Sequence, residues 1–527
     1  MNEISVIKKD WRKIDLSFGL VYPNYYELGI SSYTIRLLYY LINSNEKYVC
    51  ERIFLPKGIR FPASEDHSSD QSIRSIENKI NPIDFDILGF SIHYENDFKN
   101  VLWIIEKSGI PLYSQKRRET MLKEGFKYPL IIGGGHVITS NPLPLNEIFD
   151  LFFIGDCEPN LNLFLATFLK FKTAKINFQE LLHQLKVING IYIPSLKNET
   201  KRAILENVDE SPIPIFQLIS KSKTRRKIFE ENFFIEINRG CPFQCKFCIS
   251  SFHNSPFRNR SYEIILKSIK EAILQTQFEK ISLIGSCVSS HPKFYEICDY
   301  IVKKGKKLSI PSIRIDHLTP KIIRVLERAN IKSITIAPEA GTETLRYSLG
   351  KRISNEKILE VLEQIKESKI KNVKLYFLIG LPDERDEDIK EIINLLNQIS
   401  DIGFETNSLK VNINPFVPKF NTPYESKINF YLSSNLKLLI SKFQMLEKIL
   451  KKIPAIKLKF QKPKEIVKKA RMQTIFSLGD ETISELLIKY YIHGGNLGAL
   501  RRAEKELGIS IDNYLLRVHS GYIPWKI

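Results

Sequence analysis

Three cysteines in one short loop are the residues of this chain whose types and spacing most clearly indicate chemistry. Cys241, Cys245 and Cys248 follow an apolar run (233–237), with three residues between the first pair and two between the second. Cysteine thiolates hold iron–sulfur clusters, and a four-iron cluster held by only three of them leaves its fourth iron open to a substrate or cofactor. The spacing therefore predicts a [4Fe–4S] cluster with one open position.

Zinc binding and disulfide bonding are the alternative explanations of these cysteines. A structural zinc site normally has four ligands, and the nearest further candidates, His253 and Cys287, do not lie at zinc-ribbon spacing. A disulfide between thiols this close in the chain would be strained, and three thiols leave one over. The cluster is therefore the favoured interpretation.

The loop and several later segments resemble the radical S-adenosylmethionine (SAM) enzymes. The aromatic residue that precedes the last cysteine in that family is Phe247 here. The similarity continues through PEAGTE (338–343), IGLP (379–382) and NPFVPK (414–419), which match the branch that contains the methylthiotransferases and the elongator-type catalytic subunit. The opening segment 22–29 and the final Pro524-Trp525 are similar to a subgroup in which a cobalamin-binding-type domain precedes the radical SAM core.

This resemblance implies a reaction and its cofactors. In such enzymes S-adenosylmethionine binds the open iron, and an electron from a reducing electron donor cleaves it to methionine and a 5′-deoxyadenosyl radical, which abstracts a hydrogen atom. The protein binds and orients the cofactor, and the cofactor brings the reaction. The resemblance assigns Cys241, Cys245 and Cys248 as the metal ligands.

Seven residues, most of them near predicted strand ends, are expected to bind the cofactor: Phe247, Gly285, Ser286, Arg314, Glu339, Arg346 and Gly380. Gly285 and Ser286 stand where many relatives have a Gly-Gly-Glu motif that holds the cofactor's amino group, so Ser286 or backbone carbonyls would make this contact. Glu339 and Arg346 match a carboxylate and a cation that engage polar groups of the cofactor, and Arg can hold a carboxylate by two parallel hydrogen bonds. A helix-capping Glu with a solvated Arg is the structural alternative.

Arg314 and Gly380 complete this set for different reasons. Arg314 lies by alternation on the same face as Ser312, and a charged residue at the end of an inner strand must be paired or face a cavity. Gly380 would let the backbone approach the adenine, as it does in relatives, and close packing is the alternative explanation.

The length of 527 residues exceeds what one hydrophobic core normally serves, so we expect several domains of the α/β class. The expected segments are a Rossmann-like, cobalamin-binding-type domain (1–200), a charged linker (201–230), a radical SAM core (231–430) and a basic, mainly helical region (431–527).

In the first domain, short apolar strands alternate with stretches of helical spacing, which predicts a parallel sheet with helices on both faces. Ligands of such sheets bind at the carboxyl ends of the strands, where this chain has the glycine-rich segments 133–136 and 155–158. The Asp-x-His-x-x-Gly motif of many cobalamin domains is absent, and neither His93 nor His136 has its partners. Cobalamin would therefore bind without that histidine ligand, or the domain is a scaffold.

In the core, six predicted strands are separated by helical stretches, which fits a partial, TIM-like (βα)6 barrel with its chemistry at the carboxyl ends of the strands. These strands are expected near 233–238, 280–285, 308–314, 332–337, 373–379 and 409–414.

The charge of the chain is concentrated near its end. Residues 431–527 hold 18 Lys and Arg against 8 Asp and Glu, which contributes +10 to the formal net charge of +19. Such a surface can neutralise phosphates, so a nucleic-acid partner is one interpretation. A solvated lysine-rich face is the other, because the run lacks interleaved aromatic or Arg residues for base stacking.

We expect a cytoplasmic protein with no membrane partner. No apolar run approaches the roughly 18 residues that cross a bilayer, and the first residues lack a signal-peptide hydrophobic segment. Four of the 7 cysteines are scattered singly, which is typical of a reducing compartment.

Three classes of function remain open on the sequence. The first is a radical SAM enzyme that acts on an unactivated carbon, with cobalamin as a methyl carrier where that cofactor binds. The second is a methylthiotransferase-like RNA-modifying enzyme, which in the relatives needs a second cluster on three N-terminal cysteines, whereas only Cys50 and Cys157 precede the loop. The third is a non-catalytic iron–sulfur or nucleic-acid-binding protein, which would not need the later strand-end motifs.

Overall fold

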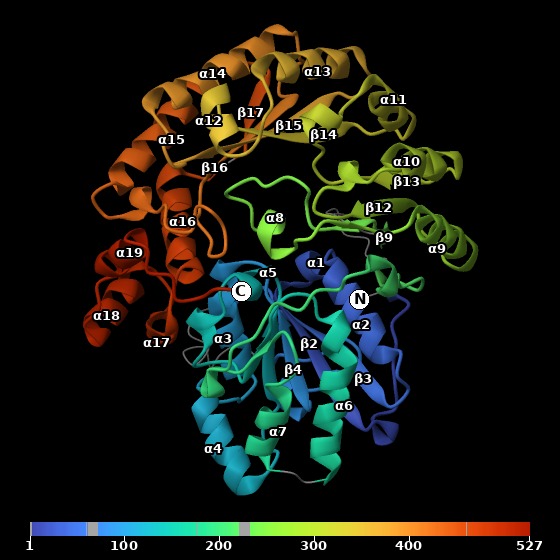
Figure 1. The fold of residues 1–527 in the computed structure, drawn as a ribbon, viewed down its shortest axis with the longest axis vertical. Helices are drawn as coiled ribbons and strands as arrows, with labels where there is room; N and C mark the ends of the chain where they lie inside the picture. The colour runs from blue at the N-terminus through green and yellow to red at the C-terminus, as the bar shows by residue number, and fades with distance from the viewer. Residues whose placement is uncertain (1–2, 60, 62–71, 175–176, 221–231, 460) are drawn as a thin grey trace. The chain divides into compact units, whose positions relative to one another are not determined.

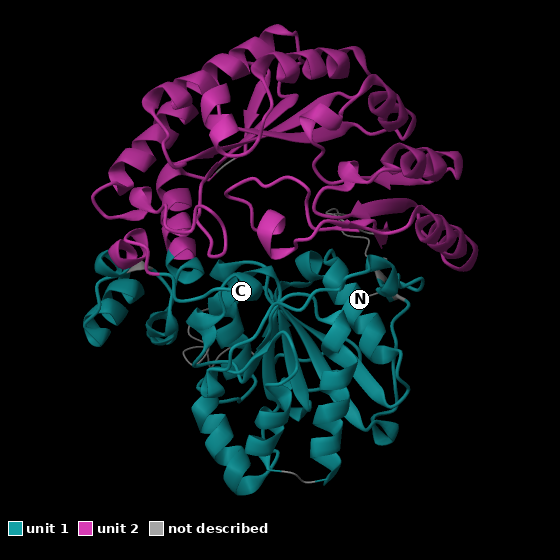
Figure 2. Cartoon of the chain, in the orientation of Figure 1, with its two compact units in different colours: residues 1–230, 475–514, 523–527 teal, residues 231–474, 515–522 magenta. Residues whose placement is uncertain are grey.

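The computed structural model describes residues 3–59, 61, 72–174, 177–220, 232–459 and 461–527. These residues form a mixed α/β fold with parallel strands (Figure 1). The chain divides into two compact units: unit 1 comprises 1–230, 475–514 and 523–527, and unit 2 comprises 231–474 and 515–522 (Figure 2). The predicted basic region (431–527) thus contributes residues to both units, and part of the predicted linker (221–230) lies outside the described residues.

A six-stranded sheet forms the centre of unit 1, with strand order β3-β2-β4-β5-β6-β7. Its strands are β2 (Leu16–Tyr25), β3 (Tyr48–Leu55), β4 (Ile87–Ser91), β5 (Leu130–Gly134), β6 (Leu151–Phe153) and β7 (Ile191–Tyr192). Neighbouring strands are parallel except for β6 and β7, and the register places Ile87 beside both Phe18 and Leu130. A short antiparallel pair, β1 (Glu3–Ile4) and β8 (Ile219–Ser220), lies apart from this sheet.

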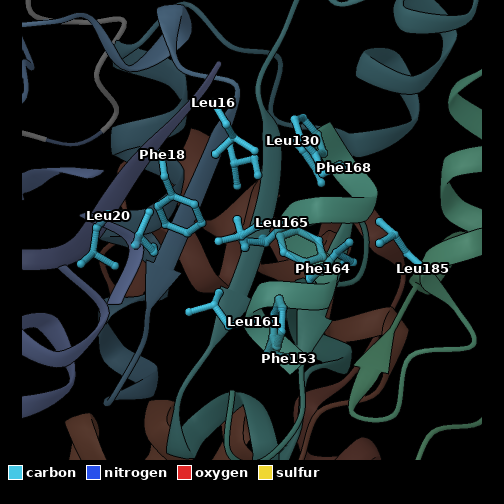
Figure 3. Packing of buried hydrophobic residues seen from close by; sticks show 14 of the residues in the cluster. Leu16, Phe18, Leu20, Leu130, Phe153, Leu161, Phe164, Leu165, Phe168 and Leu185 are labelled. Carbon is cyan, nitrogen blue, oxygen red and sulfur yellow. The ribbon is translucent and has the colours of Figure 1, made fainter. Parts of the chain in front are cut away.

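Three helices cover one face of this sheet: α2 (Tyr33–Asn43), α6 (Glu158–Ala174) and α7 (Phe178–Leu185). Their apolar residues pack with those of the strands into one buried cluster, in which Phe164 and Leu165 of α6 lie close to Phe153 of β6 (Figure 3). Such burial stabilises the unit by roughly 2 kcal/mol for each large apolar side chain. The alternation of strands and helices in the sequence therefore identified the architecture of this unit correctly.

The last part of the chain completes the packing of unit 1. Helix α17 (Glu481–Ile492) contacts α3 (Phe98–Lys107), and the rings of Phe98 and Phe476 are 5.7 Å apart. Asn141 Nδ2 donates to the carbonyl oxygen of Gly479 at 2.7 Å. Residues 475–514 therefore belong to the first core rather than to a separate helical extension.

The remaining helices of unit 1 are α1 (Tyr26–Gly29), α4 (Ser114–Glu124), α5 (His136–Ser140) and α18 (Leu497–Leu507). Two further helices, α16 (Pro463–Ser477) and α19 (Ile511–His519), contribute residues to both units. No described helix combines the length and the apolar character that a membrane-crossing segment requires.

The described residues of unit 2 form seven strands in two parallel sheets, besides a short antiparallel pair, β10 (Asn238–Arg239) and β11 (Arg258–Asn259). The first sheet has the order β13-β12-β9, and the second has the order β14-β15-β16-β17. These strands are β9 (Asn232–Glu236), β12 (Lys280–Ile284), β13 (Lys307–Ser309), β14 (Ser333–Glu339), β15 (Asn372–Ile379), β16 (Leu409–Pro415) and β17 (Ile456–Leu458). The backbone N–H of Ile313 donates to the carbonyl oxygen of Thr335 at 3.0 Å and so links the segment after β13 to β14.

The six predicted core strands correspond to β9, β12, β13, β14, β15 and β16, while β17 extends the second sheet. The described residues of unit 2 do not close into a barrel, which agrees with the expected partial barrel. In β14 and β15, fully buried residues alternate with half-buried ones, as expected for strands that have helices on one face only. Glu339 is the last residue of β14, and the register with β15 is irregular between Ile336 and Glu339.

Helices follow the strands of unit 2: α8 (Ile249–His253), α9 (Tyr262–Gln275), α10 (Phe294–Lys303), α11 (Pro320–Arg328), α12 (Glu343–Ser348), α13 (Asn355–Glu367), α14 (Asp386–Asp401) and α15 (Leu436–Leu450). Several begin at side chains that cap their first backbone N–H groups. Thr342 accepts from the N–H of Leu345, and Ser354 accepts from that of Lys357. These caps fix the starts of α12 and α13 close to the end of β14.

Candidate functional site

The three-cysteine loop follows β9 and β10 and leads into α8. Gly240, directly before the first cysteine, has φ +79°, and a Cβ there would lie 2.4 Å from the carbonyl oxygen of Asn254. Only glycine tolerates this conformation and close approach. The N–H of Lys246 donates to the carbonyl oxygen of Leu349 at 2.9 Å, so the loop is also tied to the end of α12.

The donor set of this loop fits an iron–sulfur cluster by its kind and number. Cys245 is buried, and Cys241 and Cys248 are half-buried. Burial raises the pKa of the Cys245 thiol, and the nearby ammonium of Lys351 opposes this rise. Within the described residues, no three His, Cys, Asp or Glu side chains converge as the ligands of one metal ion would. Because cluster cysteines bind separate irons, this wider spacing does not conflict with a cluster.

A fourth cysteine, Cys287, lies against the loop. It follows β12 and is buried, and its Sγ accepts a hydrogen bond from Ser290 Oγ at 3.1 Å. The neighbouring Cys241 thiol lowers the pKa of Cys287, and Cys287 in turn raises the pKa of Cys241. The sequence had shown Cys287 only as an isolated cysteine at the wrong spacing for zinc, because no pattern along the chain links the end of β12 to the loop.

Arg314 is held above the aromatic ring of Phe243, which lies within the cysteine loop. Its guanidinium carbon is 3.5 Å from the ring centroid, and Nε and Nη2 donate to the two carboxylate oxygens of Asp316 at 2.9 and 2.8 Å. The ring of His317 contacts Phe243 from another direction, with centroids 5.6 Å apart. The structure thus brings Arg314 to the cysteine loop, with its charge balanced by Asp316.

Glu339 pairs with Lys351 rather than with Arg346. Lys351 Nζ lies 3.0 Å from Glu339 Oε1, and both side chains are almost completely buried. Gly350, with φ +84°, brings this segment so close to the cysteine loop that a Cβ would lie 2.8 Å from the carbonyl oxygen of Gln244. A buried carboxylate and ammonium are therefore placed beside Cys245. Lys351 was not predicted from the sequence, because it lies twelve residues after Glu339, beyond the PEAGTE segment (338–343) that resembles the family.

Arg346 is surrounded by backbone carbonyl groups of the turn after β14. Its side chain is fully buried, and its guanidinium donates to four backbone carbonyl oxygens and to Asn355 Oδ1, the carbonyls being those of Pro338, Ala340, Gly341 and Ile353. Burial lowers the pKa of Arg346 to about 10. The residue therefore holds the turn after β14 together, and its expected contact with the cofactor stays a prediction.

Close packing explains why position 285 is a glycine. A Cβ at this position would lie 2.1 Å from Oδ1 of Asn238, whose side chain is fully buried. The Nδ2 group of Asn238 donates to the carbonyl oxygen of Cys287 at 2.8 Å. Gly285 thus leaves room for the Asn238 side chain, which connects the start of β10 to the segment after β12, while its neighbour Ser286 is exposed.

The last two expected cofactor residues lie in well-packed turns. Phe247 packs against a small cluster of buried apolar residues after β14, β15 and β16. Gly380 has φ +77°, and its N–H donates to Glu384 Oε2 at 2.8 Å. Glu384 is buried and is paired with Lys442 at 2.9 Å. Gly380 is therefore required for the turn after β15 on conformational grounds alone.

In unit 1, aromatic and imidazole side chains gather where β2, β4 and β5 end. The rings of His93 and His136 are 6.0 Å apart, those of Tyr22 and His93 are 5.9 Å apart, and His93 Nε2 lies 3.0 Å from Ser91 Oγ. Burial, with a smaller effect of His136, lowers the pKa of His93 to about 4. This edge of the sheet is the one at which parallel α/β sheets bind ligands.

Comparisons with known proteins agree with this arrangement. Residues 34–194 match the family model described as radical SAM proteins, N-terminal, and residues 235–396 match that of the radical SAM superfamily. An uncharacterized protein of Methanocaldococcus jannaschii is 28% identical over 98% of this chain and 99% of its own length. A tRNA-2-methylthio-N(6)-dimethylallyladenosine synthase of Staphylococcus epidermidis is 26% identical over 33% of this chain and 35% of its own length.

Among solved structures, the fold is similar to that of the radical SAM methyltransferase TsrM from Kitasatospora setae, determined with cobalamin and a [4Fe–4S] cluster bound. The TM-score is 0.52 at 12% identity, over 78% of this chain and 77% of that one. The fold and the cysteine loop therefore define a radical SAM enzyme. The chain belongs to the radical SAM superfamily and carries both the N-terminal domain and the core of such proteins.

Proposed function

We propose that this chain uses a [4Fe–4S] cluster, held by Cys241, Cys245 and Cys248, to cleave S-adenosylmethionine reductively to a 5′-deoxyadenosyl radical. The observation that carries the proposal is the three-cysteine loop after β9 of a matched radical SAM core. When bound, the cluster supplies an open iron for the cofactor and the electron that breaks its sulfonium bond.

The charged side chains beside the loop suit the polar end of S-adenosylmethionine. Lys351 and Arg314 offer cations for its carboxylate, and Glu339 offers an acceptor for its amino group. The Lys351 and Glu339 side chains are almost completely buried, so their interactions are screened less than those of surface charges. Each cation already has a carboxylate partner, so neither charge is uncompensated before the cofactor binds.

The cysteine assignment is tested by three single variants, Cys241→Ala, Cys245→Ala and Cys248→Ala, after anaerobic reconstitution. Each should lose cluster absorbance and the release of 5′-deoxyadenosine in the presence of dithionite. Cys298→Ala is the matched control, since Cys298 is a buried cysteine of unit 2 in α10. A cluster that survives all three substitutions would refute the assignment, and an intact cluster without cofactor cleavage would favour a binding protein.

We further propose that unit 1 binds cobalamin as the methyl carrier of a methyl transfer. The match to the N-terminal family model, the fold shared with a cobalamin-bound methyltransferase and the ring-lined edge of the unit 1 sheet support this proposal. The methyl acceptor is a carbon from which the radical removes hydrogen. Corrin absorbance that stays with the chain after purification with added cobalamin would support it, and a chain that never retains corrin would leave unit 1 as a scaffold.

RNA is the partner that the basic stretch 451–469 favours. This stretch holds eight lysines and one acidic residue, and all eight lysines are exposed. They extend from the end of α15, past β17, into the first half of α16: Lys451, Lys452, Lys457, Lys459, Lys462, Lys464, Lys468 and Lys469. Lysines placed this densely can bind phosphates and release counterions. The tRNA-modifying relative supports RNA as the nucleic acid.

A four-lysine variant tests this partner. Changing Lys451, Lys452, Lys457 and Lys459 to Gln should weaken binding of bulk tRNA and flatten the dependence of log K on log salt, by close to one unit for each lost phosphate contact. A control variant changes the exposed Lys116 and Lys123 of α4. If the slope of log K against log salt were equal in the wild type, the four-lysine variant and the control variant, the stretch would be a solvated lysine-rich face without a nucleic-acid partner.

Methylthiotransferase-like chemistry is the second candidate reaction. It would require a further cluster, and the only cysteines of unit 1 are Cys50, which is fully buried, and Cys157. A cytoplasmic location is supported by the four cysteines outside the loop, which carry free thiols. Measuring iron per chain separates the two chemistries, because a second cluster would double the content of one cluster.

A further inference from the structure

The two faces of the second sheet of unit 2 differ in burial. Helices α13, α14 and α15 lie on one side of β14–β17 (Figure 1). In β15 and β16, fully buried residues alternate with residues that are half-buried or exposed. Because successive side chains of a strand point to opposite faces, the second set lies together on the other side of the sheet. We call this side the polar face.

Three lysines lie side by side on the polar face, across three neighbouring strands. The register pairs Lys374 of β15 with Lys410 of β16, and Lys410 with Lys457 of β17. Residues paired in this way share a face of the sheet, and neighbouring strands lie about 4.8 Å apart. The three side chains therefore form one row, which we call the lysine row.

The lysine row has no countercharge among the described residues. No described carboxylate pairs with its ammonium groups, and no hydrogen bond joins them to another described group. Two buried lysines elsewhere in unit 2, Lys351 and Lys442, are each paired with a carboxylate. Like charges directly opposite each other destabilise a sheet. An anion bound across the row removes this repulsion, and phosphate is an anion that lysine commonly binds.

An aromatic ring and two amides lie on the same face. Tyr376 follows Lys374 by two residues, is in register with Asn412, and is half-buried. Asn414 is the next residue of β16 on this face. Within the described part of the chain, no hydrogen bond occupies these three side chains. An accessible ring can stack on a nucleic-acid base, and amides can form hydrogen bonds with the edge of that base.

The order of these groups along the strands suits a nucleotide. Tyr376 lies about 7 Å closer than Lys374 to the carboxyl end of β15, at roughly 3.3 Å per residue. The carboxyl end of the neighbouring β14 carries Glu339, to which we assign cofactor binding. A phosphate on the lysine row therefore leaves the base of its nucleotide on the side of the proposed cofactor site.

We propose that the polar face binds one nucleotide of the RNA partner, with its phosphate on the lysine row and its base stacked on Tyr376. This inference rests on RNA as the proposed partner and names the surface that would hold the nucleotide. Charge complementarity carries it, because the row offers three cations without a described carboxylate partner to a polyanion. Lys457 also belongs to the basic stretch 451–469, so the row continues that stretch across the sheet.

The phosphate contact is tested by equilibrium binding of a fluorescein-labelled adenosine oligoribonucleotide to the full-length, anaerobically reconstituted protein. Lys374→Gln/Lys410→Gln should raise the dissociation constant on the order of tenfold and flatten the slope of log K against log salt, by about 0.7 for each lost phosphate contact. Lys374→Arg/Lys410→Arg keeps both charges and should keep the wild-type binding. The matched control is Lys366→Gln/Lys390→Gln, because these exposed lysines lie on α13 and α14.

The stacking contact has a different signature. Tyr376→Ala should weaken binding on the order of tenfold and leave the salt slope unchanged, because a contact between a ring and a base releases no counterions. Tyr376→Phe keeps the ring and should keep the affinity. A Tyr376→Ala variant that binds as tightly as the wild type would refute the placement of the base.

Equal affinities and salt slopes in the wild type and Lys374→Gln/Lys410→Gln would overturn the inference and leave RNA as the partner, because Lys457 and the rest of the basic stretch are unchanged in this variant. A wild type that binds no RNA would refute the proposed partner itself. If inorganic diphosphate then raised the Tm of the wild type and not that of the Gln variant, the row would bind a small phosphate compound, which also overturns the inference. These measurements are made without S-adenosylmethionine, so they do not depend on the proposed radical chemistry.

Discussion

Glu339 and Lys351 form an ion pair at the end of β14, with 3.0 Å between Oε1 and Nζ, although almost nothing of either side chain is exposed. Glu339 also has φ +72°, a left-handed conformation that is unusual for a residue other than glycine. Such strain costs on the order of 1 kcal/mol and persists where the surrounding structure enforces it. The strain and the buried ion pair are the two observations on which we base the proposal that Glu339 takes part in cofactor binding.

Replacing this carboxylate should weaken cofactor binding without removing the cluster. Glu339→Gln loses one charged acceptor for the amino group of S-adenosylmethionine, and we expect its dissociation constant to rise on the order of tenfold. Calorimetric titration of the anaerobic, reconstituted protein measures this change. Glu360→Gln, in the exposed first half of α13, is the control, and equal affinities in the two variants would contradict a cofactor role of Glu339.

Replacing Arg346 should lower the free energy of unfolding of the protein. Arg346→Lys keeps the positive charge but cannot reach the four carbonyl oxygens and the Asn355 side chain that the guanidinium contacts. Buried acceptors that lose a charged partner cost on the order of 3 kcal/mol, which lowers the Tm by several degrees.

The comparison variant is Arg352→Lys, because Arg352 is exposed and only six residues away. Its Tm should stay at the wild-type value in differential scanning calorimetry. If Arg346→Lys kept the wild-type Tm but bound S-adenosylmethionine more weakly, this result would support the contact with the cofactor that the sequence predicts for Arg346.

The buried imidazole of unit 1 predicts a pH dependence of stability. The pKa of His93 is lowered to about 4 from 6.5, mainly by burial, so the unfolded chain takes up the proton first as the pH falls. His93 therefore destabilises the folded state progressively as the pH falls from about 6.5 to about 4. Asp97, whose pKa burial raises to about 6, acts in the opposite direction over part of that range.

Removing the imidazole should reduce this acid sensitivity. His93→Asn should lose less Tm than the wild type between about pH 7 and about pH 5, because its side chain does not titrate. His136→Asn is the matched control, since His136 is exposed. Parallel Tm curves for the wild type and His93→Asn would show that His93 does not carry the dependence.

The sequence predicted those features that depend on local pattern. Period-two alternation and short apolar runs located the six strands of the core, because a strand buried under helices must have such residues. The cysteine loop was recognisable because its three thiols lie within eight residues. The roles of Gly285 and Arg346 depend on Asn238 and Asn355, which no periodicity connects to them. The packing of residues 475–514 into unit 1 was missed for the same reason, since an amphipathic helix does not specify the surface that covers its apolar face.

Gly285 offers a direct test of this long-range packing. In Gly285→Ala the new methyl group would lie 2.1 Å from Asn238 Oδ1, so the Asn238 side chain must move and give up its bond to Cys287. We expect a lower Tm and less iron per chain after reconstitution, because the cysteine loop loses its connection to the segment after β12. Ser286→Ala should change neither quantity, since Ser286 is exposed.

A double variant separates this clash from a loss of cofactor contact. Asn238→Ser shortens the side chain that occupies the space, so Gly285→Ala should cost less Tm in that background than in the wild type, a coupling that is expected of residues in contact. Purely additive Tm losses would show that the two residues act independently. In that case Gly285 would be constrained by something other than Asn238, and the contact of backbone carbonyls with the amino group of the cofactor, expected from the resemblance, would be its best explanation.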